Sequence, residues 1–217
     1  MRVVAAPDKF RGTGSAQQVA GAIARAVSAL GGSADMVPMA DGGEGTLDVL
    51  GGPNRSTIVT GPLGDPVEAQ WRLEGRNAVI EMARASGLDL VGGRAGNSPL
   101  DATTAGTGEL ILTAVEKGAR RVIVGLGGSA TTDGGLGALE AMGSLARFRG
   151  IELLVACDVR TIFVEAAEVF APQKGASLAQ VAMLSGRLER LAQFYAEEHG
   201  LDVRDLPRSG AAGGLAG

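Results

Sequence analysis

Residues 120–135, RRVIVGLGGSATTDGG, place a run of β-branched side chains directly before a loop rich in glycine and hydroxyl groups. The run at 122–124 is apolar on both faces, which is typical of a buried strand. Five of the last eleven residues are glycine, so something must approach this backbone closely. A buried strand that runs into such a loop predicts an α/β fold with a parallel sheet, whose ligands gather beyond the carboxyl ends of the strands.

The rest of the chain alternates strands and helices in the same way. Residues 3–6 predict a short strand that ends at Pro7, and the following residues predict a helix that starts at Ser15 and stops at the Gly31-Gly32 pair. Further predicted elements are a strand near 35–38, a helix over 107–117, a strand that ends at Asp158 and an amphipathic helix over 177–199. Residues 57–91 are richer in strand patterns, so we expect a domain boundary near residues 50–57.

Composition excludes several functional classes. The net charge of −4 and the isoelectric point near 5.1 argue against nonspecific nucleic-acid binding, which needs a basic surface. Cys157 is the single cysteine, so we expect neither an internal disulfide nor a cysteine-based zinc site. The opening MRVVAAPDKF does not resemble a signal peptide, and no apolar run approaches the ~18 residues of a membrane span. We therefore expect a cytoplasmic protein without nucleic-acid or membrane partners.

Four predicted loops contain residue types that suit the same kind of ligand. They contain the sequences Pro7-Asp8-Lys9, Asp41-Gly42-Gly43-Glu44-Gly45-Thr46, Gly127 to Asp133, and Asp158. Glycines let backbone N–H groups reach phosphate oxygens, hydroxyls donate hydrogen bonds, and carboxylates hold Mg²⁺ directly or through water. The loops together predict a magnesium–phosphate site.

Other types of site are disfavoured. The chain contains neither the G-x-x-x-x-G-K-[ST] loop nor the G-x-G-x-x-G fingerprint, and its one histidine, His199, lies in a charged helix tail. Structural explanations stay open for single residues: Asp158 could cap a helix, and Lys174 could be a solvated loop lysine. Glu81, inside the apolar segment VIEMA, needs a partner, which could be structural or a substrate.

Several blocks, taken in order, resemble the type 1 glycerate kinase family. They are APDKFRGTGSA, PMADGGEGT, VIEMARASGL, ATTAGTGELI, GLGGSATTDGG, ACDV, APQKGA and the terminal GAAGGLAG. The resemblance covers nearly the whole chain and implies ATP-dependent phosphorylation of D-glycerate, typically to 2-phosphoglycerate. It implies an α/β enzyme of two domains, in which a mixed α/β domain is inserted into a Rossmann-like domain with a parallel sheet. Residues 1–55 would be the N-terminal part of the Rossmann-like domain, and residues 56–217 mostly the inserted domain.

The resemblance and the loop chemistry together suggest roles for individual residues. The predicted catalytic residues are Asp41, Asp133, Asp158, Lys9, Arg11 and Lys174. The carboxylates would bind Mg²⁺ (Asp133 and Asp158) or accept the proton of the attacking hydroxyl, and the cations would neutralise substrate and phosphoryl charge. Residues predicted to bind the ATP phosphates are Gly127, Gly128, Ser129, Thr131, Thr132, Gly43 and Glu44. The expected small-molecule partners are D-glycerate and ATP, and a homodimer is left open.

The chain departs from the family pattern in three places. Family members continue past the GAAGGLAG block, so most of the C-terminal part of the Rossmann-like domain is expected beyond residue 217. The segment at 143–149 is shorter than the family norm, and RTIFVEAAEVF replaces a glycine-rich loop after ACDV. Two alternatives follow: a phosphate-binding protein with impaired catalysis, or a kinase for a related small hydroxy acid.

Overall fold

A mixed five-stranded sheet forms the centre of the molecule in the computed structural model, which describes residues 1–10 and 13–217. The order of the strands is β3-β4-β5-β6-β7. Their bounds are β3 Arg55–Thr60, β4 Pro66–Glu74, β5 Asn77–Glu81, β6 Arg121–Gly125 and β7 Glu152–Ala156. The pairs β3–β4 and β4–β5 are antiparallel, whereas β5–β6 and β6–β7 are parallel. The predicted α/β class is confirmed, with a sheet that is mixed.

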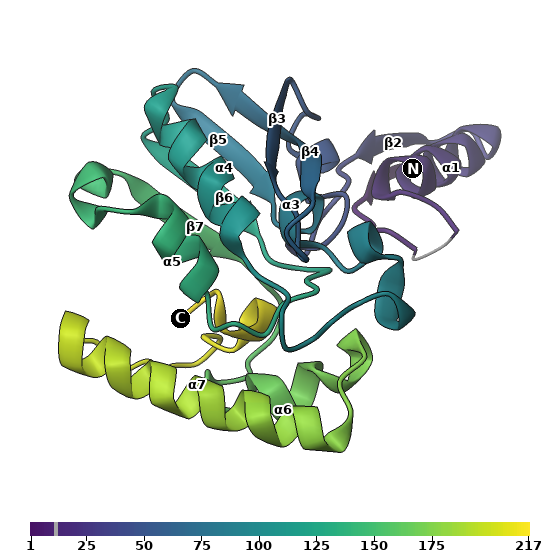
Figure 1. The fold of residues 1–217 in the computed structure, drawn as a ribbon. Helices are drawn as coiled ribbons and strands as arrows, with labels where there is room; N and C mark the ends of the chain where they lie inside the picture. Colours follow the sequence, from purple (N-terminus) through teal and green to yellow (C-terminus); the bar gives the residue numbers. More distant parts are fainter. Residues whose placement is uncertain (11–12) are drawn as a thin grey trace.

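The helix predicted over 107–117, before the strand that leads into the glycine-rich loop, is confirmed as α4, Ala105–Glu116. It packs against α5, Leu136–Met142. Figure 1 shows these two helices in front of the five-stranded sheet. The core between the layers contains large apolar side chains that are almost fully buried, among them Trp71, Ile80, Met82, Leu110, Val122 and Val124. Val122 and Val124 of β6 face this core, and Ile123, on the opposite face, is partly buried.

A smaller unit precedes this sheet. β1, Arg2–Ala5, and β2, Ser33–Met36, form a two-stranded parallel sheet, and α1, Ala16–Ala29, connects them. The Ser15 hydroxyl accepts a hydrogen bond from the Gln18 N–H, and the Gln18 side chain accepts from the Ser15 N–H, which is the capping box that fixes the start of α1. The helix α2, Thr46–Val49, leads from this lobe of β1, α1 and β2 into β3.

The C-terminal segments close the other side of the molecule. The long predicted amphipathic helix is confirmed as α7, Leu178–His199, which packs with α6, Ala166–Phe170, below the sheet in Figure 1. Short 3-10 helices complete the chain: η1 Asp89–Val91, η2 Gly93–Ala95, η3 Leu145–Phe148, η4 Pro172–Lys174 and η5 Ala211–Gly214. The two remaining short elements are α3 Ala83–Ser86 and the α2 helix named above. Within the described ranges, the model contains no helix long and apolar enough to span a bilayer.

Candidate active site

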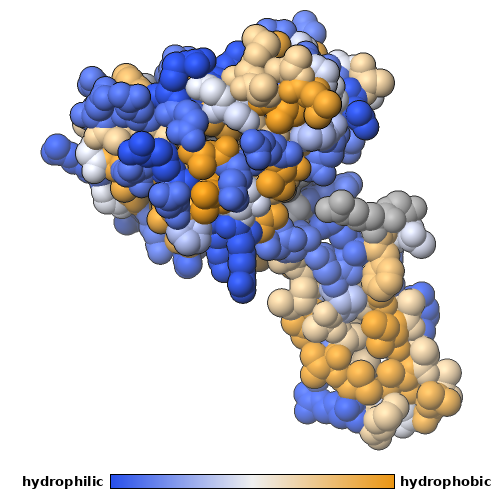
Figure 2. Space-filling view, turned by 90° about the horizontal axis from the view of Figure 1, so that it is seen from below, coloured by the Kyte–Doolittle hydropathy of each residue, from blue (hydrophilic) through white to orange (hydrophobic). Residues whose placement is uncertain are grey.

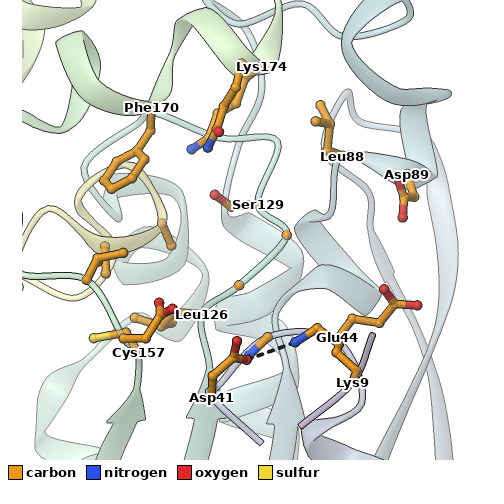
Figure 3. Close-up of a pocket in the computed structure, with 18 residues that line it drawn as sticks. Lys9, Asp41, Glu44, Leu88, Asp89, Leu126, Ser129, Cys157, Phe170 and Lys174 are labelled. Atoms are coloured by element: carbon orange, nitrogen blue, oxygen red, sulfur yellow. Dashed lines mark hydrogen bonds and ion pairs between the residues drawn. The ribbon is translucent and has the colours of Figure 1, made fainter. Parts of the chain in front are cut away.

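The loops that follow β1, β2, β6 and β7 meet in one cavity of about 580 Å³. Residues that line it and were predicted from the sequence are Lys9, Asp41, Gly43, Glu44, Gly127, Gly128, Ser129, Asp158 and Lys174. Figure 3 shows Lys9, Asp41 and Glu44 at one end and Lys174 at the other, with Ser129 between them. Because these segments come from both sheets, the cavity lies where the carboxyl ends of two separate sets of parallel strands face each other.

An ion pair occupies one end of the cavity. Lys9 Nζ donates to Asp41 Oδ1 at 3.0 Å, and the Gly43 N–H donates to the same oxygen at 2.7 Å. Burial acts to raise the pKa of Asp41, but the hydrogen bonds from Gly43 and Lys9 outweigh it, so the pKa lies below its usual value. The carboxyl group is therefore ionised at neutral pH. Both of these hydrogen bonds go to Oδ1 and neither to the second oxygen, Oδ2.

Close backbone packing between two loops explains part of the glycine content. A Cβ on Gly127 would lie 2.4 Å from Gly43 Cα, and a Cβ on Gly42 would lie 2.1 Å from the Ala156 carbonyl oxygen. The Gly127 N–H donates to the Gly42 carbonyl at 2.9 Å, so this amide, predicted to hold phosphate, is engaged within the protein. Among the described residues, none accepts from the N–H groups of Gly128 and Ser129, which remain available to an anion.

The other end of the cavity holds a buried cation. Lys174 is only 2% exposed, and its Nζ donates to the Thr131 carbonyl. Burial lowers the pKa of Lys174 to about 7, against an opposing effect from the charge of Asp133. An amine of this kind can hold a phosphoryl oxygen as an ammonium ion or exchange a proton near neutral pH.

The second half of the glycine-rich loop lies behind the cavity. Thr131 and Thr132 are almost fully buried, do not line the cavity, and their hydroxyls find no hydrogen-bond partner among the described residues. Asp133 Oδ2 accepts from the Thr104 N–H and from Thr104 Oγ1, both at 2.8 Å, and Asp133 Oδ1 accepts from the Gly135 N–H at 3.2 Å. These contacts give Asp133 a part in holding the loop to the start of α4.

The remaining predicted residues have different surroundings. Arg11 lies outside the described residues. Glu81 is buried, accepts from the Leu47 N–H at 2.7 Å and pairs with Arg84 Nε at 2.9 Å, so its partner is structural. Asp158 lines the cavity beside Cys157.

Several lining residues have no counterpart among the sequence predictions. They are Leu88, Asp89, Leu126, Cys157, Val159, Phe170, Gln173, Ala211 and Ala212. Ala211 and Ala212 belong to the GAAGGLAG block, whose unusual composition was a usable signal. Leu88 and Asp89 reach the cavity because the Leu88 N–H donates to the Gly128 carbonyl, a contact between residues 40 positions apart that no local pattern announces.

Acidic side chains near the cavity could serve as ligands of a metal ion. Within the described chain, no three His, Cys, Asp or Glu side chains are grouped so as to hold a metal. Mg²⁺ needs few protein ligands when phosphates and water supply the others. Asp158 fits that requirement at the cavity wall, whereas the Asp133 oxygens already accept hydrogen bonds from the protein.

A second cavity of about 900 Å³ adjoins this one, and Lys9 and Glu44 line both. The N-terminal end of α1 and Arg84 border the second cavity. The two cavities together offer room for two ligands that meet beside the Lys9–Asp41 pair.

The chain is similar to several known proteins. The model of the "Glycerate kinase family" matches residues 3–147 and 144–217. A "Glycerate 2-kinase" from Escherichia coli (strain K12) is 39% identical over 254 residues, which cover 99% of this chain and 66% of that protein. A "Glycerate kinase" from Bacillus subtilis (strain 168) is 40% identical over 254 residues, with coverage of 99% and 66%. The chain thus spans slightly less than two thirds of the length of these relatives.

A solved structure is also similar. The crystal structure of a Salmonella typhimurium LT2 protein, assigned as glycerate kinase 2, has a TM-score of 0.88 and 36% sequence identity to this chain. The match covers 100% of this chain and 68% of that one. The two segments of the family match overlap at residues 144–147.

Proposed function

The chain belongs to the glycerate kinase family, and on this premise we propose that its protein transfers the γ-phosphoryl group of ATP to the C2 hydroxyl of D-glycerate. The products are ADP, 2-phosphoglycerate and a proton. One observation carries the proposal: cations, carboxylates and free backbone N–H groups from loops of two sheets line one cavity. Phosphoryl transfer depends mainly on positioning and charge stabilisation, which these groups supply.

The phosphate-binding end is formed by the glycine-rich loop and Lys174. In this proposal the free N–H groups of Gly128 and Ser129, the Ser129 hydroxyl and the Lys174 ammonium hold the phosphates of ATP. Gly127 and Gly43 act differently, because their close packing lets the two loops share one wall. Thr131 and Thr132 support this loop from behind.

The acceptor end is formed by the Lys9–Asp41 pair. Lys9 neutralises the carboxylate of D-glycerate, and Asp41 Oδ2 accepts the proton as the C2 oxygen bonds to phosphorus and the bond to ADP breaks. The low pKa of Asp41 keeps this acceptor ionised. Glu44 borders both cavities and so faces the junction of the two ligands.

A magnesium ion fits this arrangement when it arrives with the nucleotide. Asp158 is the protein carboxylate that would hold it, with phosphate oxygens and water as the other ligands. Bound in this way, Mg²⁺ neutralises charge on the phosphates. The hydrogen bonds of Asp133 favour Asp158 over Asp133 for this role.

The architecture is part of the proposal. Residues 1–55 are the N-terminal part of a Rossmann-like domain, and residues 56–217 are mostly an inserted mixed α/β domain, in a cytoplasmic enzyme whose Rossmann-like domain continues beyond residue 217. Apolar side chains support this, because Val4 and Met36 on the two-stranded sheet are 64% and 53% exposed. Figure 2 shows apolar side chains gathered on this lobe. Further strands would bury them, and this chain covers only 66% of the length of the two relatives.

The test is direct phosphorylation followed by phosphorus NMR. The protein is incubated with Mg-ATP and D-glycerate, beside the variants Asp41→Asn and Asp65→Asn. Asp65 is an exposed turn residue and serves as the matched control. We expect 2-phosphoglycerate from the wild type and from Asp65→Asn, and a loss on the order of 10²-fold or more in Asp41→Asn. Folded protein that leaves D-glycerate unchanged would contradict the assignment, and an active Asp41→Asn would remove Asp41 from the chemistry.

A further inference from the structure

Asn97 connects the two segments that form the phosphate-binding end of the cavity. Its side-chain Nδ2 donates to the Ala130 carbonyl at 3.0 Å and to the Lys174 carbonyl at 2.9 Å. Ala130 directly follows Ser129 in the glycine-rich loop, and Lys174 ends η4. One amide group thus uses both of its protons on backbone oxygens from two segments that are distant in sequence.

Only a donor with two hydrogens can make this bridge. The two carbonyl oxygens are acceptors, so a side chain that only accepts would repel both of them. The Asn97 oxygen Oδ1 is buried without a hydrogen-bond partner among the described residues, so the amino group carries the connection. Loss of this amide would remove a hydrogen-bond donor from the Ala130 and Lys174 carbonyl oxygens. An unpaired carbonyl away from water costs free energy.

Two further contacts surround this bridge, one between η4 and the glycine-rich loop and one between η4 and η2. Lys174 Nζ donates to the Thr131 carbonyl, one residue beyond Ala130. Gly175 has a φ of +100°, and a Cβ there would lie 2.6 Å from the Arg94 carbonyl oxygen, so η2 and η4 pack closely. The η2 turn that precedes Asn97 is therefore held against the turn that carries Lys174.

We propose that Asn97 is a positioning residue that holds the Lys174 ammonium in register with the glycine-rich loop. Figure 3 shows Ser129 between Lys174 and the end of the cavity that holds Lys9 and Asp41, and Asn97 connects the backbone of Lys174 to that of Ala130, the residue after Ser129. The contribution of Asn97 to catalysis rests on the proposed function, in which these two residues hold phosphate. Its contribution to the surroundings of Lys174 does not, and can be measured without a substrate.

The test follows the titration of Lys174 by NMR. The chain has three lysines, Lys9, Lys117 and Lys174, so ¹³C labelling of lysine Cε gives few signals, and Lys174→Met identifies the one of interest. In Asn97→Ala, water reaches the loosened amine, and we expect the midpoint of Lys174 to rise by about one pH unit or more. Asn97→Ser, which keeps one donor, should give a smaller rise and is the second variant if Asn97→Ala does not fold.

Asn54 offers a matched control. Its Nδ2 donates to the Leu73 carbonyl and its Oδ1 accepts from the Leu73 N–H, on an exposed edge near β3. Asn54→Ala should therefore leave the Lys174 midpoint unchanged. An unshifted midpoint in folded Asn97→Ala and Asn97→Ser would overturn the proposal, as would an equal shift in Asn54→Ala.

Kinetic measurements separate the proposal from the proposed function. With Mg-ATP and D-glycerate, kcat of Asn97→Ala should fall about 10- to 100-fold, because a displaced cation no longer meets the transferring phosphate. A shifted midpoint without glycerate phosphorylation by the wild type would support the position of Asn97 and contradict the function. If Asn97→Ala keeps the full activity of the wild type and its Lys174 midpoint is unshifted, the positioning role of Asn97 is contradicted and the proposed function is not.

Discussion

Replacement of Lys174 by methionine tests the energetic cost of a buried amine. Lys174 is 2% exposed, and burial lowers its pKa from 10.5 to about 7, against an opposing effect from the charge of Asp133. Methionine has a similar length and no charge, so the variant removes the titrating group and keeps most of the packing. The loss of the hydrogen bond to Thr131 changes stability by an amount that does not depend on pH.

The sign and size of the effect follow from proton linkage. Below the folded pKa both the folded and the unfolded chain are protonated, and the full cost of the buried ammonium is present. Between about pH 7 and 10.5 the unfolded chain holds a proton that the folded protein has lost, so the free energy of unfolding rises with pH. The slope is at most about 1.4 kcal/mol per pH unit. The wild type should thus gain about 2 kcal/mol between pH 7 and pH 9 relative to Lys174→Met.

Urea unfolding followed by tryptophan fluorescence measures this difference. Trp71 is the single tryptophan and is fully buried in the core between the sheet and its helices, so its emission reports loss of the fold. The free energies of wild type and Lys174→Met are compared from pH 7 to pH 9, with the exposed Lys117→Met as control. A difference between wild type and Lys174→Met that stays constant over this range would refute the reasoning, and so would the same pH dependence in Lys117→Met.

Three further predictions concern the stability of single substitutions. Glu81→Ala should lower the free energy of unfolding by about 3 kcal/mol, because the Arg84 guanidinium loses its buried partner; an unchanged urea midpoint would contradict this. Gly127→Ala should destabilise the protein by about 1–3 kcal/mol, since the new Cβ would meet Gly43 Cα at 2.4 Å. Gly21→Ala, inside α1, should instead stabilise by about 0.5–1 kcal/mol, because the new Cβ would meet only the flexible Arg25 side chain, at 3.5 Å; thermal unfolding of both glycine variants would reveal a failure of either sign.

Local patterns in the sequence predicted the longer helices and the strand before the glycine-rich loop. The cap at Ser15 and the positive φ of Gly31, +72°, fix the ends of α1, and the helix predicted over 107–117 is α4, Ala105–Glu116. The strand that ends before the glycine-rich loop was equally clear, because a continuously apolar run of that length is typical of a strand buried on both faces. These are short-range effects, in which a residue and its near neighbours decide the backbone conformation.

The meeting of the loops was also predictable in part. Parallel strands bring their carboxyl ends to one edge, so a site that included Lys9, Asp41, Ser129 and Asp158 followed from the order of strands and loops. The assignment of Lys174 as a site residue was supported by the family resemblance, and the structure shows it at the cavity wall.

The sequence by itself therefore determined the α/β class, the position of the longer helices and of the strand before the glycine-rich loop, and the set of loops that meet. Only the tertiary structure decided which polar groups face the cavity and which serve the protein itself. Asp133 and Gly127 belong to the same motif as Gly128 and Ser129. Asp133, however, is hydrogen-bonded to Thr104, and Gly127 is hydrogen-bonded to Gly42. The physical reason is distance along the chain: these partners lie tens of residues away, and the choice between ligand and protein depends on a three-dimensional arrangement that no local pattern encodes.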